Sequence, residues 1–376
     1  MKRSHTRANA PLSPLCGARE WKLRCRLQYL SKCDSRDHAI ESVASARSFL
    51  STAWLRLGLI VLTLLFMARG AHAQTNEQRT LVLVIGVAGE PEYGDKFSAW
   101  AKLWKQGATD GGMHVRVVGE DAETNENDLA RLQKILTEEV SRQAGELWLV
   151  FIGHGTFDGQ TAKFNLRGPD ISAADLAVAL KPCHRPLAVV QCASSSGPFL
   201  SALSAPGRVI ITATRSGYED NATRFGGYMA GAIASSAADL DKDGQTSLLE
   251  AFLMASRQVE EYYKNEGLLM TEHALLDDNG DGFGTPPDWF HGVRATKTAA
   301  GGKAVDGLRA NQMFLIRGTS EQSLSPETRE RRDELERQLD ALRAHKSAMK
   351  ADDYYKQLEG LMVQTARLYE TNSAQK

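Results

Sequence analysis

The stretch "LWLVFIGHG", residues 147–155, places six apolar residues in a row and then a histidine between two glycines. A short, continuously apolar run of this kind is typical of a strand covered on both faces in a parallel sheet. Open parallel sheets bind ligands beyond the carboxyl ends of their strands. The run therefore predicts that His154 lies at the edge of the sheet where binding and chemistry take place.

Short apolar runs alternate with longer helical patterns on both sides of this stretch. The expected strands are LVLVIGV, MHVRVVG, ELWLVFIG, PLAVVQC and RVIITAT, and the helical patterns between them are DKFSAWAKLWKQ, NDLARLQKILTEEVSRQ and ISAADLAVAL. This β-α-β alternation predicts an α/β fold, with a doubly wound, mostly parallel sheet and helices on both faces.

The composition changes twice along the rest of the chain. Acid-rich loops and then a Gly/Ala/Lys-rich segment follow the expected sheet, so we place the end of the main domain near residue 318 and assign it residues 80–318. The tail, 325–372, carries two amphipathic patterns, at Leu335, Leu339, Leu342 and Met349, and at Tyr354, Leu358, Leu361 and Leu368. They predict either a helical hairpin packed on the core or a short coiled coil with a partner.

The first 73 residues differ from the remainder. Twelve basic residues face four acidic ones between Lys2 and Arg69, and the uncharged run Leu57–Met67 is followed by the small-x-small pattern "AHA". This pattern predicts a leader with a signal peptide over 1–73, cleaved near Ala73, and export to the periplasm or the exterior. Without cleavage the apolar run is a membrane anchor or a buried helix.

Charge and cysteine content restrict the exported part. Losing the leader changes the net charge from −1 to about −9, which argues against nucleic acid as a partner. Three cysteines lie in the leader, so only Cys183 and Cys192 remain. A disulfide-stabilised scaffold is therefore excluded, although a single bridge is not.

Cys192 ends the apolar strand that follows the one ending at His154. Its small neighbours in "CASSSG" leave the sulfur accessible, and a helix starting near Ser195 offers a dipole that lowers the thiol pKa. Because one helical crossover separates the two strands, we expect both side chains to face one crevice. Amide hydrolysis then has a nucleophile in Cys192, an acid in His154, and oxyanion donors in the N–H groups of Gly155 and Cys192.

The two motifs "VFIGHG" and "LAVVQC" resemble the caspase and legumain superfamily of cysteine peptidases. Gln191 adjoins Cys192 directly and the histidine lies 38 residues upstream, whereas caspases have Q-A-C-x-G and a gap of about 50. The shorter gap and "IITATRS" look more like the legumain branch. The resemblance covers roughly Thr80 to Tyr228 and implies a caspase-like fold, a Cys–His dyad and cleavage after a chosen P1 residue.

Substrate-binding residues are less clear from the sequence. In the loop "GEPEYGD" the acids Glu92 and Asp95 favour a basic P1 side chain, unless the loop is only solvated. Arg215 and Ser216, after the "IITAT" strand, are candidates for a pocket wall, unless they form a plain surface loop. Cys183 and His273 are weaker rivals for nucleophile and base.

The segment 239–250, "DLDKDGQTSLLE", satisfies the D-x-D-x-D-G-x5-E pattern of an EF-hand-like loop. Gly244 makes its sharp turn, and the expected Ca²⁺ ligands are Asp239, Asp241, Asp243, the Gln245 carbonyl and Glu250. The alternative is an acidic cap on the following helix without a metal.

The segment 277–288, "DDNGDGFGTPPD", repeats the spacing with Asp277, Asn279 and Asp281 as candidate Ca²⁺ ligands. Pro286 and Pro287 exclude a regular exiting helix. Structural calcium would brace loops near the active crevice in both cases.

These features predict an exported cysteine endopeptidase that acts on a peptide or protein substrate. One alternative is a catalytically inactive caspase-like module that binds a partner, or a second copy, through its helical tail. Another is a thiol hydrolase or transamidase with non-peptide or amine-acceptor substrates.

Overall fold

The computed structural model describes residues 78–120, 127–302 and 304–373. The predicted leader over 1–73, its cleavage near Ala73 and its three cysteines lie outside these residues. Within the described part of the chain, no helix has both the length and the apolarity needed to cross a membrane.

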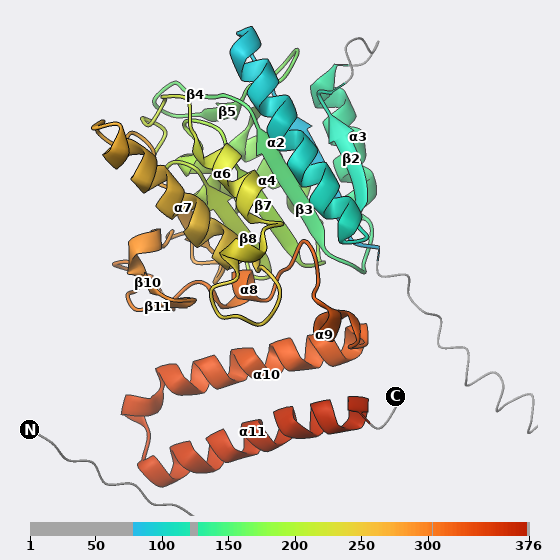
Figure 1. The fold of residues 1–376 in the computed structure, drawn as a ribbon, viewed down its shortest axis with the longest axis vertical. Coiled ribbons are helices and arrows are strands. Elements are labelled where there is room, and N and C mark those ends of the chain that lie inside the picture. The colour runs from blue at the N-terminus through green and yellow to red at the C-terminus, as the bar shows by residue number, and fades with distance from the viewer. Residues whose placement is uncertain (1–77, 121–126, 303, 374–376) are drawn as a thin grey trace, which may run out of the picture. The chain divides into compact units, whose positions relative to one another are not determined.

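A six-stranded sheet forms the centre of the described chain (Figure 1), in the order β2-β1-β3-β7-β8-β9. All pairings are parallel except the last, in which β9 runs antiparallel to β8. The strands are β1 (Thr80–Ile85), β2 (His114–Val118), β3 (Leu147–Ile152), β7 (Leu187–Gln191), β8 (Arg208–Thr212) and β9 (Leu275–Asp277).

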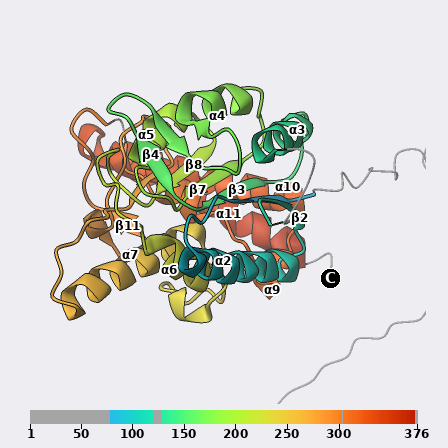
Figure 2. The ribbon, with the colours of Figure 1, turned by 90° about the horizontal axis from the view of Figure 1, so that it is seen from above.

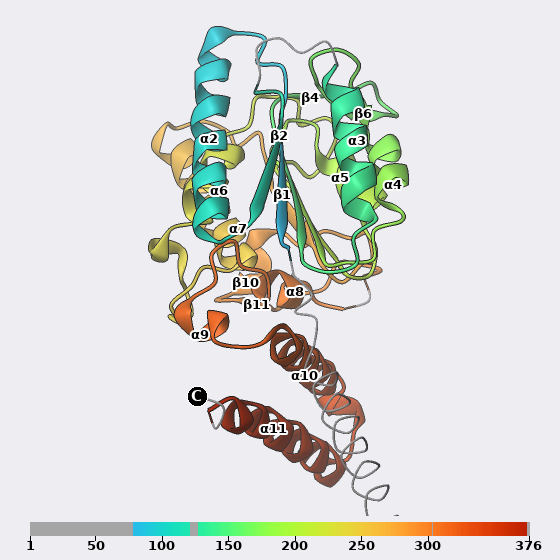
Figure 3. The ribbon, with the colours of Figure 1, turned by 90° about the vertical axis from the view of Figure 1, so that its right-hand side faces the viewer.

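Helices cover both faces of this sheet. One layer consists of α2 (Pro91–Asp110), α6 (Phe225–Ala232) and α7 (Leu248–Asn265), and the other of α3 (Asp128–Val140), α4 (Ala173–Leu180) and α5 (Gly197–Leu203). Figures 2 and 3 show the sheet between the two layers. The predicted doubly wound, mostly parallel α/β fold is confirmed.

The two faces explain why the strands are continuously apolar. In β3, Trp148, Val150 and Ile152 belong to the core on the α2/α6/α7 side, whereas Leu149 and Phe151 belong to the core on the α3/α4/α5 side. Side chains alternate across a strand, so a strand covered on both faces needs apolar residues at every position.

Smaller elements lie at the two ends of the sheet. A three-stranded antiparallel sheet, β4-β5-β6, follows β3 directly. Its strands are β4 (Gly155–Phe157), β5 (Ala162–Phe164) and β6 (Ile171–Ser172). The remaining short elements are η1 (Ser236–Ala238), η2 (Pro287–Trp289), β10 (Phe290–His291), β11 (Arg294–Ala295), α8 (Leu308–Asn311) and α9 (Thr319–Gln322).

Side-chain caps fix where several helices begin. Asn127 accepts a hydrogen bond from the N–H of Ala130 at the start of α3, and Ser172 accepts one from Asp175 at the start of α4. Such caps satisfy backbone donors that have no partner inside the helix.

The tail forms the predicted helical hairpin of α10 (Pro326–Ala344) and α11 (Ala351–Ser373), joined through η3 (Lys346–Ala348). Ser325 caps α10 and Pro326 occupies its first turn. Leu335, Leu342 and Tyr354 are buried. Both predicted helices are therefore present.

Candidate active site

His154 and Cys192 come together at the carboxyl edge of the sheet. They follow β3 and β7, which are adjacent and parallel, with Phe151 opposite Gln191. Ile152 and Val190 point into the α2/α6/α7 layer, and Cys192 belongs to the same core. His154 contacts α2 in that layer. The two side chains therefore lie on the same face of neighbouring strands, as the sequence predicted.

The thiol of Cys192 is buried, contrary to the expectation that its small neighbours leave it accessible. The residue is 1% exposed, and the position of a Cβ on Gly226 would lie 2.9 Å from its Cβ. Burial raises the thiol pKa to about 12. A thiol with this pKa is almost entirely protonated at neutral pH, so the conformation described here does not present a thiolate.

Aromatic side chains of α2 surround the imidazole of His154. The ring centroids of Tyr93 and Phe97 lie 4.6 and 5.2 Å from it. Its Nε2 atom lies 3.2 Å from the carbonyl oxygen of Ala88. Burial lowers the histidine pKa, more than this contact raises it. The ring is therefore positioned as a neutral group.

A third aromatic residue of α2, Trp100, packs against Gly226 of α6, which also lies against the Cβ of Cys192. Its ring lies 5.6 Å from that of Phe97, centroid to centroid. A Cβ on Gly226 or Gly227 would come within 2.9 or 2.8 Å of the Trp100 ring, so the paired glycines let the indole pack against α6. The sequence alone did not place these aromatic residues at the site, although the spacing 93, 97, 100 indicates one helix face.

The two predicted oxyanion donors are both occupied. The N–H of Gly155 donates to Ser194 Oγ at 3.2 Å, and the N–H of Cys192 donates to the carbonyl oxygen of Phe151 at 3.0 Å. Ser194 Oγ in turn donates to the Gly155 carbonyl at 3.1 Å. The expected oxyanion hole is thus not open in this conformation. The helix expected near Ser195, α5, begins two residues later and has seven residues.

The loop after β8 packs against the loop after Cys192. Ser195, which has a positive φ of 54°, donates its N–H to the carbonyl oxygen of Glu219 at 2.8 Å. The Glu219 carboxylate holds Arg215 Nε at 3.1 Å and His273 Nδ1 at 2.6 Å. The N–H of Ser216 lies where a side chain on residue 197 would otherwise project. Arg215 and Ser216 therefore lie at the predicted edge, and Glu219 and His273 join them there.

Glu92 and Asp95 do not lie in a loop. Both belong to the start of α2, where Glu92 is in the first turn. Lys96 Nζ lies 2.5 Å from the Glu92 carboxylate and lowers its pKa. The sequence interpretation of an acidic loop is wrong because Pro91 starts the helix early.

Cys183, the rival nucleophile, lies before β7, at the amino edge of the sheet and opposite His154. Burial raises its thiol pKa. Its place agrees with the preference for Cys192.

The first acid loop brings three of its predicted ligands together. Carboxylate oxygens of Asp239, Asp241 and Asp243 lie within 4.8 Å of one another. Burial and the neighbouring carboxylates raise the pKa of Asp241. Such crowding of like charges fits a bound divalent cation, and Gly244, with φ of 91°, makes the sharp turn.

Glu250 contacts the backbone of this loop and also caps the helix that follows it. One carboxylate oxygen accepts the N–H groups of Leu240 and Asp241, and the other accepts the backbone N–H and the hydroxyl O–H of Ser247. With Ser247 it forms a capping box at the start of α7. The Gln245 side chain accepts the N–H of Gly318. The capping role, which was the alternative for this loop, is therefore present beside the carboxylate cluster.

The second acid loop is folded by its own side chains. The Asp277 carboxylate accepts the N–H groups of Gly280 and Gly282, Asn279 accepts that of Asp281, and Asp281 accepts that of Phe283. The short η2 follows instead of an α-helix, as the two prolines predicted.

A cleft of about 1360 Å³ lies near the loop after β8, although neither His154 nor Cys192 lines it. Arg215 and Phe225 connect it to the loops around Cys192, and His273 lines it as well. Its other walls include Leu253 and Trp289. A concave, mainly apolar surface with a few polar groups is typical of a ligand site.

The molecule thus has a mostly parallel α/β sheet with a cysteine and a histidine at neighbouring strand ends. No protein-family model matches the sequence, and no curated protein matches it. Among solved structures, the Drosophila initiator caspase Dronc is 15% identical, with a TM-score of 0.40, covering 58% of this chain and 88% of that one.

Two other solved structures are similar to a comparable degree. Caspase-1 from Spodoptera frugiperda is 9% identical, with a TM-score of 0.36, covering 54% of this chain and 87% of its own. A protein from Geobacter sulfurreducens is 12% identical, with a TM-score of 0.36, and the match covers 53% of this chain and 93% of that one. With TM-scores below 0.5, these likenesses carry no argument about activity or substrate.

Proposed function

We propose that the chain is a cysteine endopeptidase of the caspase/legumain kind whose dyad is closed in the conformation described. The observation that carries the proposal is the placement of His154 and Cys192 on one face of adjacent parallel strands, at their carboxyl ends. This is the edge where parallel α/β sheets bind ligands. The large cleft beside Arg215 supplies room for a peptide.

Turnover on this proposal requires an opening movement. Trp100 and the start of α6 must leave the sulfur, and the N–H of Gly155 must leave Ser194 Oγ. The sulfur then attacks the scissile carbonyl, with its proton passing to His154. The imidazolium gives that proton to the departing amine, and water hydrolyses the acyl-enzyme to release the acid and the free thiol.

Calcium and export belong to the same proposal. Calcium on Asp239, Asp241 and Asp243 would fix the loop before α7, whose helix forms part of the layer over Cys192. Export through the leader supplies an environment rich enough in calcium for a weak site.

The test is a peptide library incubated with the purified chain, with and without calcium, beside Cys192→Ala and His154→Ala variants. We expect cleavage by wild type, loss with Cys192→Ala, and faster cleavage in a Trp100→Ala background because the thiol is uncovered. Equal behaviour of wild type and Cys192→Ala on every peptide, in both backgrounds, rejects the peptidase. Turnover of amide or ester substrates without peptide cleavage points to the thiol hydrolase alternative.

A second candidate is a non-catalytic binding module. The sealed thiol and the occupied oxyanion donors favour it. Its docking surface would be the outer side of α11, where Tyr355 and Met362 are 57% and 53% exposed. The library result separates the two candidates, because a binding module cleaves nothing in either background.

A further inference from the structure

A cavity of about 590 Å³ lies at the amino edge of the sheet, away from His154 and Cys192. The segments before β3, β7 and β8 form one wall, and α8 and α10 contribute the other. Its lining is rich in guanidinium groups, contributed by Arg185, Arg208, Arg309, Arg317, Arg329 and Arg337.

Most of these groups are already bound to the protein. Three of them pair with carboxylates, namely Arg185 with Glu139 at 3.0 Å, Arg317 with Glu146 at 2.7 Å and Arg337 with Glu334 at 3.0 Å. Arg208 instead donates to the carbonyl oxygens of Leu180 and Leu203, at 2.7 and 3.0 Å. Its positive charge is therefore held by dipoles and not by an anion.

Arg309 is the exception. Within the described part of the chain its guanidinium group makes no hydrogen bond or ion pair, and its Nε atom is buried. Burial and the positive charge of Arg337 both lower its pKa, against attraction from the carboxylates of Asp278, Asp333 and Glu334. A partly buried cation without a direct partner is costly, and a neighbouring cation adds to the cost.

Carboxylates also line the cavity, and several of them are engaged elsewhere. Arg332 bonds both Glu321 and Asp333, and Glu146 is shared with Arg317. The other lining acids, Glu327 and Glu330, lie on the exposed side of α10. Glu146, Glu321 and Asp333 are therefore bonded to arginines other than Arg309.

We propose that this cavity binds an oxyanion, a carboxylate or a phosphate-type group, through Arg309, with Arg208 and Arg337 as neighbouring cations. A guanidinium presents two parallel N–H groups that match such oxygens. The volume admits inorganic phosphate or the free carboxyl terminus of a short peptide. The site is independent of the proposed peptidase, since it lies at the opposite edge of the sheet.

The test measures the thermal unfolding midpoint of the full chain at constant ionic strength. Sodium chloride is replaced stepwise by phosphate, by sulfate, or by trialanine with a free or an amidated carboxyl terminus. A ligand that binds only the folded state raises the midpoint with its concentration. We expect one of the oxyanions to do so, and the peptide pair to show whether the source is a carboxylate or an inorganic anion.

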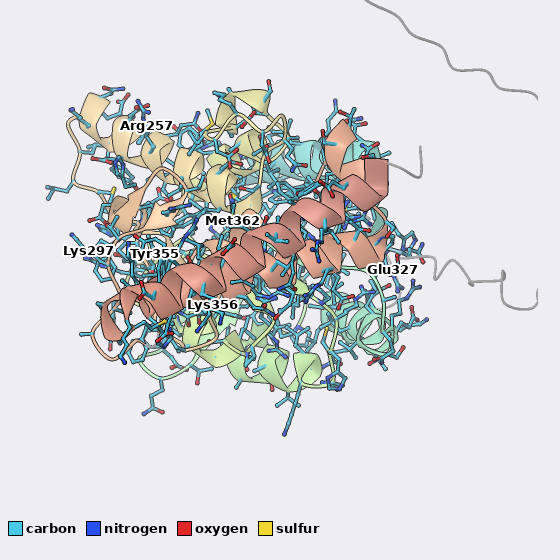
Figure 4. The ribbon with its side chains drawn as sticks, turned by 90° about the horizontal axis from the view of Figure 1, so that it is seen from below. Arg257, Lys297, Glu327, Tyr355, Lys356 and Met362 are labelled. Carbon is cyan, nitrogen blue, oxygen red and sulfur yellow. The ribbon has the colours of Figure 1, made fainter. Side chains whose placement is uncertain are left out.

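Arg309→Gln and Arg337→Gln are expected to weaken the effect by about tenfold or more in apparent affinity, since charge-assisted hydrogen bonds are lost. Arg257→Gln is the matched control. It removes the same charge from an exposed position of α7, marked in Figure 4, where Arg257 pairs with Glu261 at 2.8 Å. The absence of any shift in wild type, or equal shifts in all four proteins, overturns the proposal. If Arg309→Gln does not fold, Arg337→Gln decides.

Discussion

At the scale of single residues, burial controls what each reactive group can do. Cys192 sits among apolar side chains, and this burial raises the pKa of its thiol to about 12. His154 is held as a neutral imidazole by burial against aromatic rings. A buried thiol and a neutral imidazole are stable but not reactive, and the aromatic contacts around His154 contribute to this burial.

We predict that Cys192 in the folded chain reacts with iodoacetamide at pH 8 roughly 10³-fold more slowly than a free thiol, because its thiolate fraction is that much lower. The rate should rise with pH well beyond pH 9. Trp100→Ala should raise it further by exposing the sulfur. Mass spectrometry of the labelled peptide measures the rate.

Trp289→Ala serves as the control, since it removes a half-buried indole that lines the large cleft, which Cys192 does not line. Circular dichroism checks that both variants remain folded. Rapid labelling in wild type, or equal rates in the two tryptophan variants, would contradict the closed site.

At the scale of elements, the two acid loops show how the same residue types serve different purposes. In the first loop, three carboxylates crowd together while Glu250 caps α7. In both loops the first aspartate accepts two N–H groups of its own loop, Asp239 those of Lys242 and Gly244, and Asp277 those of Gly280 and Gly282. Among the described residues, three carboxylates lie within 4.8 Å of one another in the first loop and not in the second, so the first loop has the stronger demand for a cation.

We predict opposite effects of Asp241→Asn with and without calcium. In a chelator the variant should be at least as stable as wild type, because one of three crowded negative charges is gone. With calcium, wild type should gain stability and the variant should gain less, because a ligand is missing. Urea unfolding in both conditions measures this difference.

Asp288→Asn is the matched control, since it removes one exposed acid outside the cluster. A wild-type chain that gains no stability from calcium would rule out the metal site and leave the loop as a helix cap.

At the scale of the whole chain, the α/β unit and the tail are joined by specific contacts. Gln312, beside α8, donates to Glu336 of α10 at 2.8 Å, and Arg332 of α10 bonds Glu321 of α9. Helix α11 carries exposed apolar residues, which its packing against α10 leaves uncovered. Figure 4 shows Tyr355 and Met362 along this helix.

We predict that the chain self-associates through α11. Tyr355 and Met362 are seven residues apart, the spacing that aligns side chains on one helix face for pairing. Met362→Glu should shift sedimentation toward the monomer, whereas Gln357→Glu, which adds the same charge at another exposed position of α11, should not. If wild type is monomeric at every concentration, these residues are ordinary exposed apolar side chains.

The sequence by itself predicted the sheet, its five parallel strands and the terminal hairpin. A short, continuously apolar run is typical of a strand that is covered on both faces. The alternation of such runs with helical patterns predicts parallel strands joined by helical crossovers. It also predicted that His154 and Cys192 meet at one edge, because both end neighbouring strands. The antiparallel β9 and the helical start at Glu92 were not predicted, since each depends on neighbours distant in sequence or on a single proline.

Only the tertiary structure decided that the thiol of Cys192 is buried. Exposure of Cys192 depends on how α2 and α6 pack across it, and no local pattern around "CASSSG" specifies that Trp100 fits against Gly226 and Gly227. The environment of Arg309 was likewise decided by the tertiary structure, because the cavity that it lines is formed by segments far apart in the chain. Local sequence determines which elements form, while burial and charge pairing arise from contacts between elements that are far apart in the chain.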